Sequence, residues 1–216
     1  MCKLMKTLIA IPCMDMLPVG FVQSLLYMNK GDNPTVYLKP NSLVYDSRNL
    51  LSLYAIENGF DNVLWLDSDM LVPPNTLTKL ESYNMDMVTG LYVKRHEPVE
   101  PVLYEKIEEP ERGADGKLIA NISAYHDYQR DSFFPVAGCG FGCVLTSTKL
   151  LKHIWDEYGP AFTPYPWASE DISFCHRVNQ LGYQIYCDSS VSCGHIGQFV
   201  YTEDLIIKRG DANGQT

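Results

Sequence analysis

The sequence has no long apolar run, and none approaches the roughly 20 residues that a helix needs to cross a bilayer. The apolar part of segment 1–12 is too short for a signal peptide, and no small-residue cleavage site follows it, so a strand is expected there. The seven cysteines are odd in number and irregularly spaced, which argues against a disulfide framework and favours a reducing compartment. We therefore expect a cytoplasmic protein without a membrane span.

Basic residues are also scarce. The chain carries 17 Lys and Arg against 26 Asp and Glu, a net charge of −9, which argues against non-specific binding to nucleic acid or to anionic membranes. Its 216 residues, 46% hydrophobic and 20% charged, suit an ordinary globular protein with one sizeable core. A single domain is the expectation.

Strand and helix patterns alternate over the first ninety residues. Short apolar runs predict buried strands at 7–11, 35–38, 63–66 and 87–92. Helical spacing predicts helices at 18–28, from a cap at Asp46 to Asn58, and from 75 onward. This alternation predicts an α/β protein with a mainly parallel central sheet flanked by helices, which binds ligands at the carboxyl ends of its strands.

Two carboxylates follow the third predicted strand at such an end. Asp67 and Asp69 are two residues apart in an extended segment, so their side chains can converge on one small volume, with Ser68 between them. Paired carboxylates repel each other unless a cation lies between them, and Mg²⁺ or Mn²⁺ prefers such oxygen ligands. The alternative is a solvated acidic turn.

The second half of the chain is less regular. Segment 94–132 is rich in Glu and predicts a solvated hairpin insertion, or alternatively a lid over a substrate. Gly138, Gly140 and Gly142 clear one face of an extended segment, either for close packing or for an approaching acceptor. Ser147 is expected to cap a helix, a last strand is expected at 183–187, and 202–216 reads as a polar tail.

Five further residues are candidates for a site. Glu170 and Asp171 open a predicted helix, where they either cap it or supply a general base. His195, between two glycines, is either a metal ligand or a solvated loop residue. Arg48, beside Asn49 near a helix start, can bind an anion or lie on the surface. A zinc site built from cysteines and histidines is a weak alternative, because no Cys-x-x-Cys pair is present.

Taken in order, these segments resemble the GT-A-type nucleotide-sugar glycosyltransferases, especially the large inverting family two. The resemblance rests on Pro12 after the first strand, on Ser47 to Leu51, on Asp67-Ser68-Asp69 followed by two prolines, and on Glu170-Asp171 with a later His195. It implies that Mn²⁺ or Mg²⁺ is held by Asp69 and His195, with Asp67 on the metal or the ribose. It further implies that Asp171, or else Glu170, is the catalytic base and that the nucleotide is bordered by Pro12, Arg48, Asn49, Asp67 and Ser68.

The expected function is therefore metal-dependent transfer of a sugar from a nucleotide-diphosphate sugar, first of all a UDP-sugar, to a hydroxyl acceptor. The expected catalytic domain covers residues 1–201. The acceptor can be a glycan, lipid or protein, and less readily a modified nucleic-acid base. One rival is a phosphatase of the haloacid-dehalogenase type, whose Asp-x-Asp lies on the first strand and not, as here, on the third. The other is a sugar-nucleotide or glycan-binding module without turnover.

Overall fold

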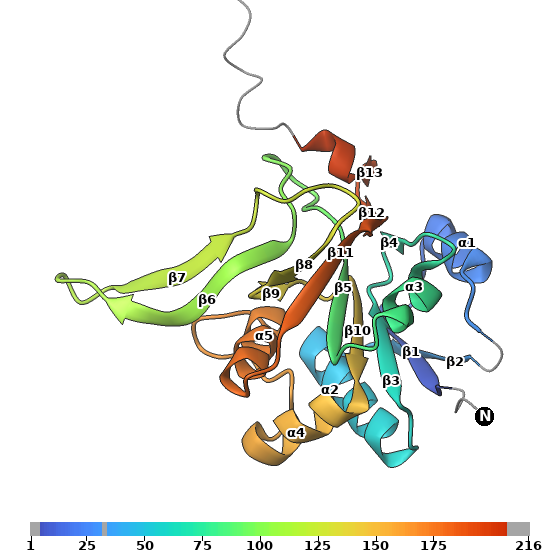
Figure 1. Ribbon diagram of the computed structural model, residues 1–216, viewed down its shortest axis with the longest axis horizontal. Coiled ribbons are helices and arrows are strands. Elements are labelled where there is room, and N and C mark those ends of the chain that lie inside the picture. Colours follow the sequence, from blue (N-terminus) through green and yellow to red (C-terminus); the bar gives the residue numbers. More distant parts are fainter. Residues whose placement is uncertain (1–4, 32–33, 207–216) are drawn as a thin grey trace, which may run out of the picture.

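The centre of the protein is a seven-stranded sheet, seen in a computed structural model that describes residues 5–31 and 34–206 (Figure 1). Its strands in spatial order are β2 (Thr35–Pro40), β1 (Thr7–Cys13), β3 (Asn62–Leu66), β10 (Cys143–Ser147), β5 (Met87–Leu91), β11 (Ile185–Ser192) and β8 (Phe133–Val136). All but β10 and β8 run in the same direction. The predicted α/β class with a mainly parallel sheet is confirmed.

Helices cover both faces of this sheet (Figure 1). One face packs against α1 (Val19–Tyr27) and α3 (Thr76–Ser82), the other against α2 (Val44–Glu57), α4 (Thr148–Tyr158) and α5 (Glu170–Gln180). Successive strand residues point to opposite faces, so Leu64 and Leu66 enter the first core while Val63 and Trp65 enter the second. This double burial explains why β3 is an unbroken apolar run.

Two details differ from the sequence prediction. Helix α2 begins at Val44, ahead of Asp46, which lies in the first turn and caps nothing, since the N-cap position is Leu43. An acidic residue in a first turn favours the helix through the macrodipole without being its cap. Strand β10 was not predicted, because it directly follows the glycine-rich segment and its last residue, Ser147, is itself the helix cap. That cap is confirmed, since Ser147 Oγ accepts a hydrogen bond of 3.1 Å from the Leu150 amide.

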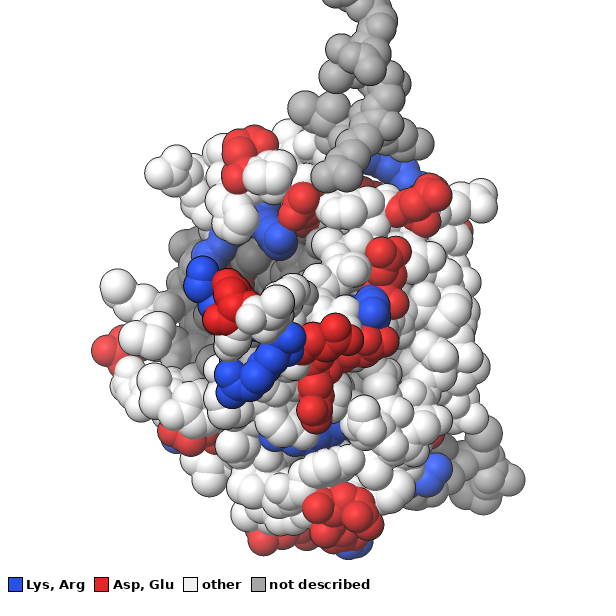
Figure 2. Space-filling model, turned by 90° about the vertical axis from the view of Figure 1, so that its left-hand side faces the viewer, with Lys and Arg blue, Asp and Glu red and all other residues white. Residues whose placement is uncertain are grey.

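Two small sheets flank the large one. In one, β6 (Leu103–Arg112) and β7 (Leu118–Ala124) form a hairpin that stands out from the body (Figure 1). Strand β6 also pairs with the short strand β9 (Gly138–Cys139). Acidic and basic side chains are interspersed on the face that carries this hairpin (Figure 2). The other sheet joins β13 (Val200–Tyr201), β12 (Gly194–Ile196) and β4 (Met70–Leu71).

The predicted tail starts with a short 3₁₀ helix, η1 (Glu203–Leu205), whose Glu203 side chain is buried. Residues 207–216 of that tail lie outside the described residues. Within residues 5–31 and 34–206, no helix combines the length and apolar character that crossing a bilayer would require.

The three alternate glycines serve close packing. A Cβ atom added to Gly140 would lie 2.0 Å from the Tyr92 hydroxyl, and one added to Gly138 would lie 2.3 Å from Ile107 Cδ1. At Gly142 the nearest atom would be Tyr92 Cζ at 2.9 Å, and its amide donates to the Tyr92 hydroxyl at 3.3 Å. The segment therefore closes around Tyr92, which favours the packing alternative over an acceptor-facing one.

We predict that Gly140→Ala lowers the free energy of unfolding by about 1–3 kcal/mol, because the added methyl group overpacks against Tyr92. Gly20→Ala in α1 is the matched control, since its Cβ would meet two side-chain methyl groups, Leu71 Cδ2 at 3.2 Å and Ile196 Cδ1 at 3.7 Å. Urea denaturation measures both. In a Tyr92→Phe background the cost of Gly140→Ala should shrink, and an equal cost in both backgrounds would contradict the clash with the hydroxyl.

Candidate functional site

A cavity of about 500 Å³ opens where the parallel strands end. The segments that follow β1, β3 and β5 contribute to it, together with the start of α2, the first residue of α5 and β12. Its lining comprises Pro12, Cys13, Met14, Ser42, Leu43, Val44, Arg48, Asp67, Ser68, Asp69, Tyr92, Arg95, Glu170 and His195. The structure thus brings seven residues predicted from the sequence to one cavity: Pro12, Arg48, Asp67, Ser68, Asp69, Glu170 and His195.

The pairing of β4 with β12 brings His195 beside Asp69. His195 lies opposite Met70 in this antiparallel pair, and the Ile196 amide donates to the Asp69 carbonyl at 2.8 Å. Nε2 of His195 then lies 3.6 Å from Asp69 Oδ2, and Nδ1 lies 2.8 Å from the carbonyl oxygen of Val93. Nδ1 must carry a proton to donate to that carbonyl, so Nε2 is the nitrogen that faces Asp69. In the protonated ring Nε2 pairs with the carboxylate, and in the neutral ring Nε2 has the lone pair that a metal ion binds.

The charge of Asp69 is stabilised by its neighbours. Burial alone would raise the pKa of this carboxyl, but the hydrogen bond and charge of His195 and the charge of Arg95 outweigh burial, and the pKa is lowered. Arg95 Nη1 lies 2.8 Å from the same Oδ2 atom. The side chain of Asp69 is therefore ionised at neutral pH and surrounded by groups that favour its anion.

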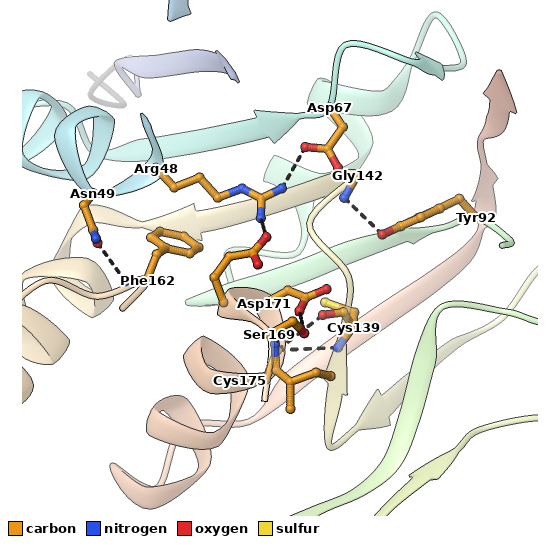
Figure 3. A network of polar contacts seen from close by, with 12 residues as sticks. Arg48, Asn49, Asp67, Tyr92, Cys139, Gly142, Phe162, Ser169, Asp171 and Cys175 are labelled. Atoms are coloured by element: carbon orange, nitrogen blue, oxygen red, sulfur yellow. Dashed lines mark hydrogen bonds and ion pairs between the residues drawn. The ribbon is translucent and has the colours of Figure 1, made fainter. Parts of the chain in front are cut away.

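A buried guanidinium joins the two acidic segments (Figure 3). Arg48 donates from Nη2 to Asp67 Oδ1 at 2.7 Å and from Nη1 to Glu170 Oε1 at 2.6 Å, while only 2% of the residue is exposed. Burial raises the pKa of Asp67 and of Glu170, and Arg48 opposes both rises. Arg48 therefore joins the residue after β3 to the start of α5, and its positive charge is neutralised by carboxylates of the protein itself.

Asp171 occupies a different position from Glu170. Its Oδ1 atom accepts hydrogen bonds from the Ser169 hydroxyl and from the Ile172 amide, the latter at 2.8 Å (Figure 3). It is partly exposed and lies near Tyr104, whose pKa is raised to about 12 by burial and then by the negative charge of Asp171. Asp171 is not part of the cavity lining, but it lies on the side where the hairpin joins the body.

Asn49 does not join the cavity. Its Oδ1 atom accepts a hydrogen bond of 2.8 Å from the Phe162 amide and so holds the loop that precedes α5 (Figure 3). Neighbouring residues of a helix point about 100° apart, and here Arg48 faces the cavity while Asn49 faces the loop before α5. The structure gives Asn49 a role in loop packing, whereas the sequence suggested that it borders the nucleotide.

The cavity offers few side chains that could ligate a divalent cation. Within the described residues, no group of three or more His, Cys, Asp and Glu side chains converges as a metal site, because Asp67 turns to Arg48 and leaves Asp69 with His195. Mg²⁺ and Mn²⁺ often bind through one or two protein ligands together with substrate phosphates and water. The pair therefore fits a cation shared with a phosphorylated ligand.

The absence of such a group from the described part of the chain also argues against the zinc alternative. Cys139, Cys175 and Cys187 are buried free thiols, and burial raises the pKa of the Cys139 and Cys187 thiols well above the ordinary value. Such thiols pack as small apolar side chains and do not readily form the thiolate that zinc requires.

Several cavity residues were not predicted from the sequence, chiefly Arg95, Tyr92, Met14 and Leu43. Arg95 and Tyr92 follow the carboxyl end of β5, so the rule that identified Asp67 after β3 would also have found them. Met14 and Leu43 are exposed apolar residues without any motif, and only the approach of the β1 and α2 segments shows their position.

Known proteins resemble this chain in structure. No protein-family model and no curated protein sequence matches it. The crystal structure of A197 from STIV matches with a TM-score of 0.65 and 20% identity over 89% of this chain and 86% of that one. The crystal structure of GalNAc-T7 with UDP, GalNAc and Mn²⁺ matches with a TM-score of 0.58 and 12% identity over 89% of this chain and 43% of that one. These likenesses show a GT-A-like fold.

We predict that Arg48→Met lowers the free energy of unfolding by about 2–4 kcal/mol at pH 7, because it leaves two carboxylates without their shared cation. Arg112→Met in the hairpin is the control, since Arg112 donates only to the Gly116 carbonyl there. Urea denaturation at several pH values measures both.

The loss in free energy of unfolding that Arg48→Met causes should depend on pH. The pKa of Glu170 is already raised by burial and rises further without Arg48, so the folded variant binds a proton more readily than the unfolded chain. The penalty should therefore grow as the pH rises through the raised pKa and shrink as the pH falls toward the ordinary glutamate value of 4.5. A deficit that is constant between pH 5 and pH 8 would contradict an electrostatic role.

Proposed function

We propose that the protein is a metal-dependent glycosyltransferase that moves a sugar from a nucleotide-diphosphate sugar to a hydroxyl acceptor. The observation that supports this most is the Asp69–His195 pair at the carboxyl edge of a GT-A-like sheet, beside a cavity of about 500 Å³. Cavities of roughly 300–1,000 Å³ commonly hold ligands of this size. The GalNAc-T7 structure of the same fold was solved with UDP and Mn²⁺, which supports a UDP-sugar donor and a divalent cation.

Asp69 and His195 would hold Mn²⁺ or Mg²⁺ against the diphosphate of the donor. The bound cation would neutralise the negative charge that develops on the leaving diphosphate. Pro12, Ser68 and Asp67 would border the nucleotide, since all three line the cavity. Arg48 would position Asp67 and Glu170 and would not itself bind the donor, because both of its bonded nitrogens already contact carboxylates.

Asp171 is the better candidate for the catalytic base. Glu170 is bonded to Arg48 at 2.6 Å, whereas Asp171 is partly exposed and its carboxylate accepts hydrogen bonds from the Ser169 hydroxyl and the Ile172 amide. In the proposed step the acceptor oxygen bonds to the anomeric carbon and gives its proton to Asp171. The bond from that carbon to the donor oxygen breaks, and the nucleoside diphosphate leaves with the electron pair. A direct displacement of this kind inverts the anomeric centre.

The catalytic domain would comprise residues 1–201, with segment 94–132 as an insertion and residues from 202 as a tail. The hairpin within this segment meets the body at Tyr104, on the side of Asp171, so it would border the acceptor. The free thiols of Cys139, Cys143 and the other described cysteines support a reducing compartment such as the cytoplasm.

We predict that UDP-sugars raise the thermal midpoint of the protein in the presence of Mn²⁺ and that free UDP is released slowly. Asp69→Asn should remove the Mn²⁺-dependent part of this shift, because it replaces the anionic ligand. Asp156→Asn on α4 is the control, since that exposed carboxylate only pairs with Lys152. A thermal-shift panel of nucleotide sugars, with released nucleotide measured in parallel, tests both.

Each rival has its own outcome in this panel. Phosphate release from simple phosphoesters would support a phosphatase, and donor binding without any nucleotide release would support a binding module. Intact Mn²⁺-dependent donor binding in Asp69→Asn would contradict the proposed metal site.

We predict that Asp171→Asn binds the donor normally but transfers sugar about 10²- to 10⁴-fold more slowly, because the base is lost. Glu170→Gln should lose less activity, since glutamine can still accept a hydrogen bond from Arg48. Initial rates with a nucleotide-release assay, and donor affinities by calorimetry, separate the two effects. A larger rate loss in Glu170→Gln than in Asp171→Asn would reverse the assignment.

A further inference from the structure

The two arginines of the cavity differ in how their charges are used. Arg48 is 2% exposed and donates to two carboxylates, so it cannot turn to a ligand without leaving Asp67 and Glu170 unpaired. The side chain of Arg95 is 48% exposed and contacts one carboxylate, Asp69. Its other contact is the backbone carbonyl of Ile196 at 3.2 Å. Arg95 is thus the arginine of this cavity that can change partner at low cost.

The segment that carries Arg95 is suited to such a change. Val93 pairs with Pro101, and the Lys94 amide donates to the Glu100 carbonyl, so both ends of a short loop are fixed. Between these ends, residues 95–98 are exposed. The Val93 carbonyl also accepts the hydrogen bond from His195 Nδ1, so Val93 fixes both the base of the loop and the candidate metal ligand. The guanidinium of Arg95 can therefore move while Val93 and His195 stay in place.

Arg95 occupies the position that a bound cation would need. Its Nη1 atom and His195 Nε2 converge on the same oxygen, Asp69 Oδ2, at 2.8 and 3.6 Å. A divalent cation bonded to Asp69 and His195 would carry its charge into this space, where two cations repel each other. The guanidinium and the metal ion therefore compete for one carboxylate oxygen.

We propose that Arg95 is a diphosphate-binding residue that pairs with Asp69 while the cavity is empty and transfers to the donor phosphates when a divalent cation takes Asp69. This inference rests on the proposed function and adds to it a residue that binds the ligand. The cavity holds three carboxylates, Asp67, Asp69 and Glu170, so a diphosphate needs positive charge beyond that of Arg48. A guanidinium released from Asp69 supplies it and can bind phosphate oxygens with two parallel hydrogen bonds.

This exchange of partners by Arg95 predicts that one substitution changes the Mn²⁺ affinity and the UDP affinity in opposite directions. Without nucleotide, Arg95→Gln should bind Mn²⁺ about threefold to fivefold more tightly than the wild type, because the competing cation is gone. At saturating Mn²⁺, the same variant should bind UDP about tenfold more weakly, because a charge-assisted contact is lost. Arg95→Lys should keep the weaker Mn²⁺ binding and lose part of the UDP affinity, since an ammonium cannot bind bidentately.

Two binding measurements on the full chain test this, and neither needs turnover. The electron paramagnetic resonance signal of unbound Mn²⁺ gives the metal affinity, and calorimetry with UDP gives the diphosphate affinity. Arg112→Gln in the hairpin is the matched control and should change neither. Local damage to the site would weaken the binding of both ligands. Tighter Mn²⁺ binding together with weaker UDP binding is therefore the result that only the exchange of Arg95 predicts.

The outcomes separate this inference from the proposed function. Unchanged or weaker Mn²⁺ binding in Arg95→Gln, beside a wild type that binds both ligands, would overturn the exchange and leave the glycosyltransferase proposal intact. Unchanged UDP affinity in Arg95→Gln would overturn the phosphate contact. A wild type that binds neither Mn²⁺ nor UDP would overturn the proposed function and the exchange with it.

Discussion

The bridge from Arg48 to Asp67 and Glu170 is the interaction on which the site depends. These three residues come from α2, the end of β3 and the start of α5, and 122 positions separate Arg48 from Glu170. Two desolvated carboxylates could not remain ionised so near each other without a cation between them. The guanidinium also lies over the rings of Phe141 and Phe162, which places the charge network directly on the core. Donor binding would therefore start from a preformed arrangement of carboxylates.

A division of labour among acidic residues follows from this bridge. Asp67 and Glu170 share Arg48, so Asp69 is left to His195 and Arg95, and Asp171 to its own helix start. The two members of each acidic motif consequently differ in chemistry although they are neighbours in sequence. One member of each pair is bonded to Arg48, and in the proposed function the other would contact the cation or the acceptor. Arg95 has a related role, because it neutralises Asp69, the carboxylate that is not bonded to Arg48.

Sequence patterns predicted the fold and half of the cavity lining because they report local physics. Apolar runs identified the parallel strands, and the rule that ligands meet strand carboxyl ends placed Asp67 and Asp69 at such an end, while the family resemblance linked His195 to them. Partner choice could not be predicted, since Arg48 finds Glu170 only through the packing of α2 and α5. Strand β10 was missed because it directly follows a glycine and ends in the helix cap Ser147, which leaves it little pattern of its own. Asn49 was misplaced because adjacency in sequence does not give a shared direction on a helix.

The central claim is that Asp69 and His195 hold a divalent cation against a nucleoside diphosphate. A crystal structure of the protein grown with Mn²⁺ and UDP, with data collected at the manganese absorption edge, tests it most directly. The account predicts one anomalous peak bonded to Asp69, His195 and phosphate oxygens, with Arg95 turned from Asp69 to the diphosphate and Arg48 still bridging Asp67 and Glu170. A manganese ion bound elsewhere, or UDP bound with no metal at Asp69, would contradict it.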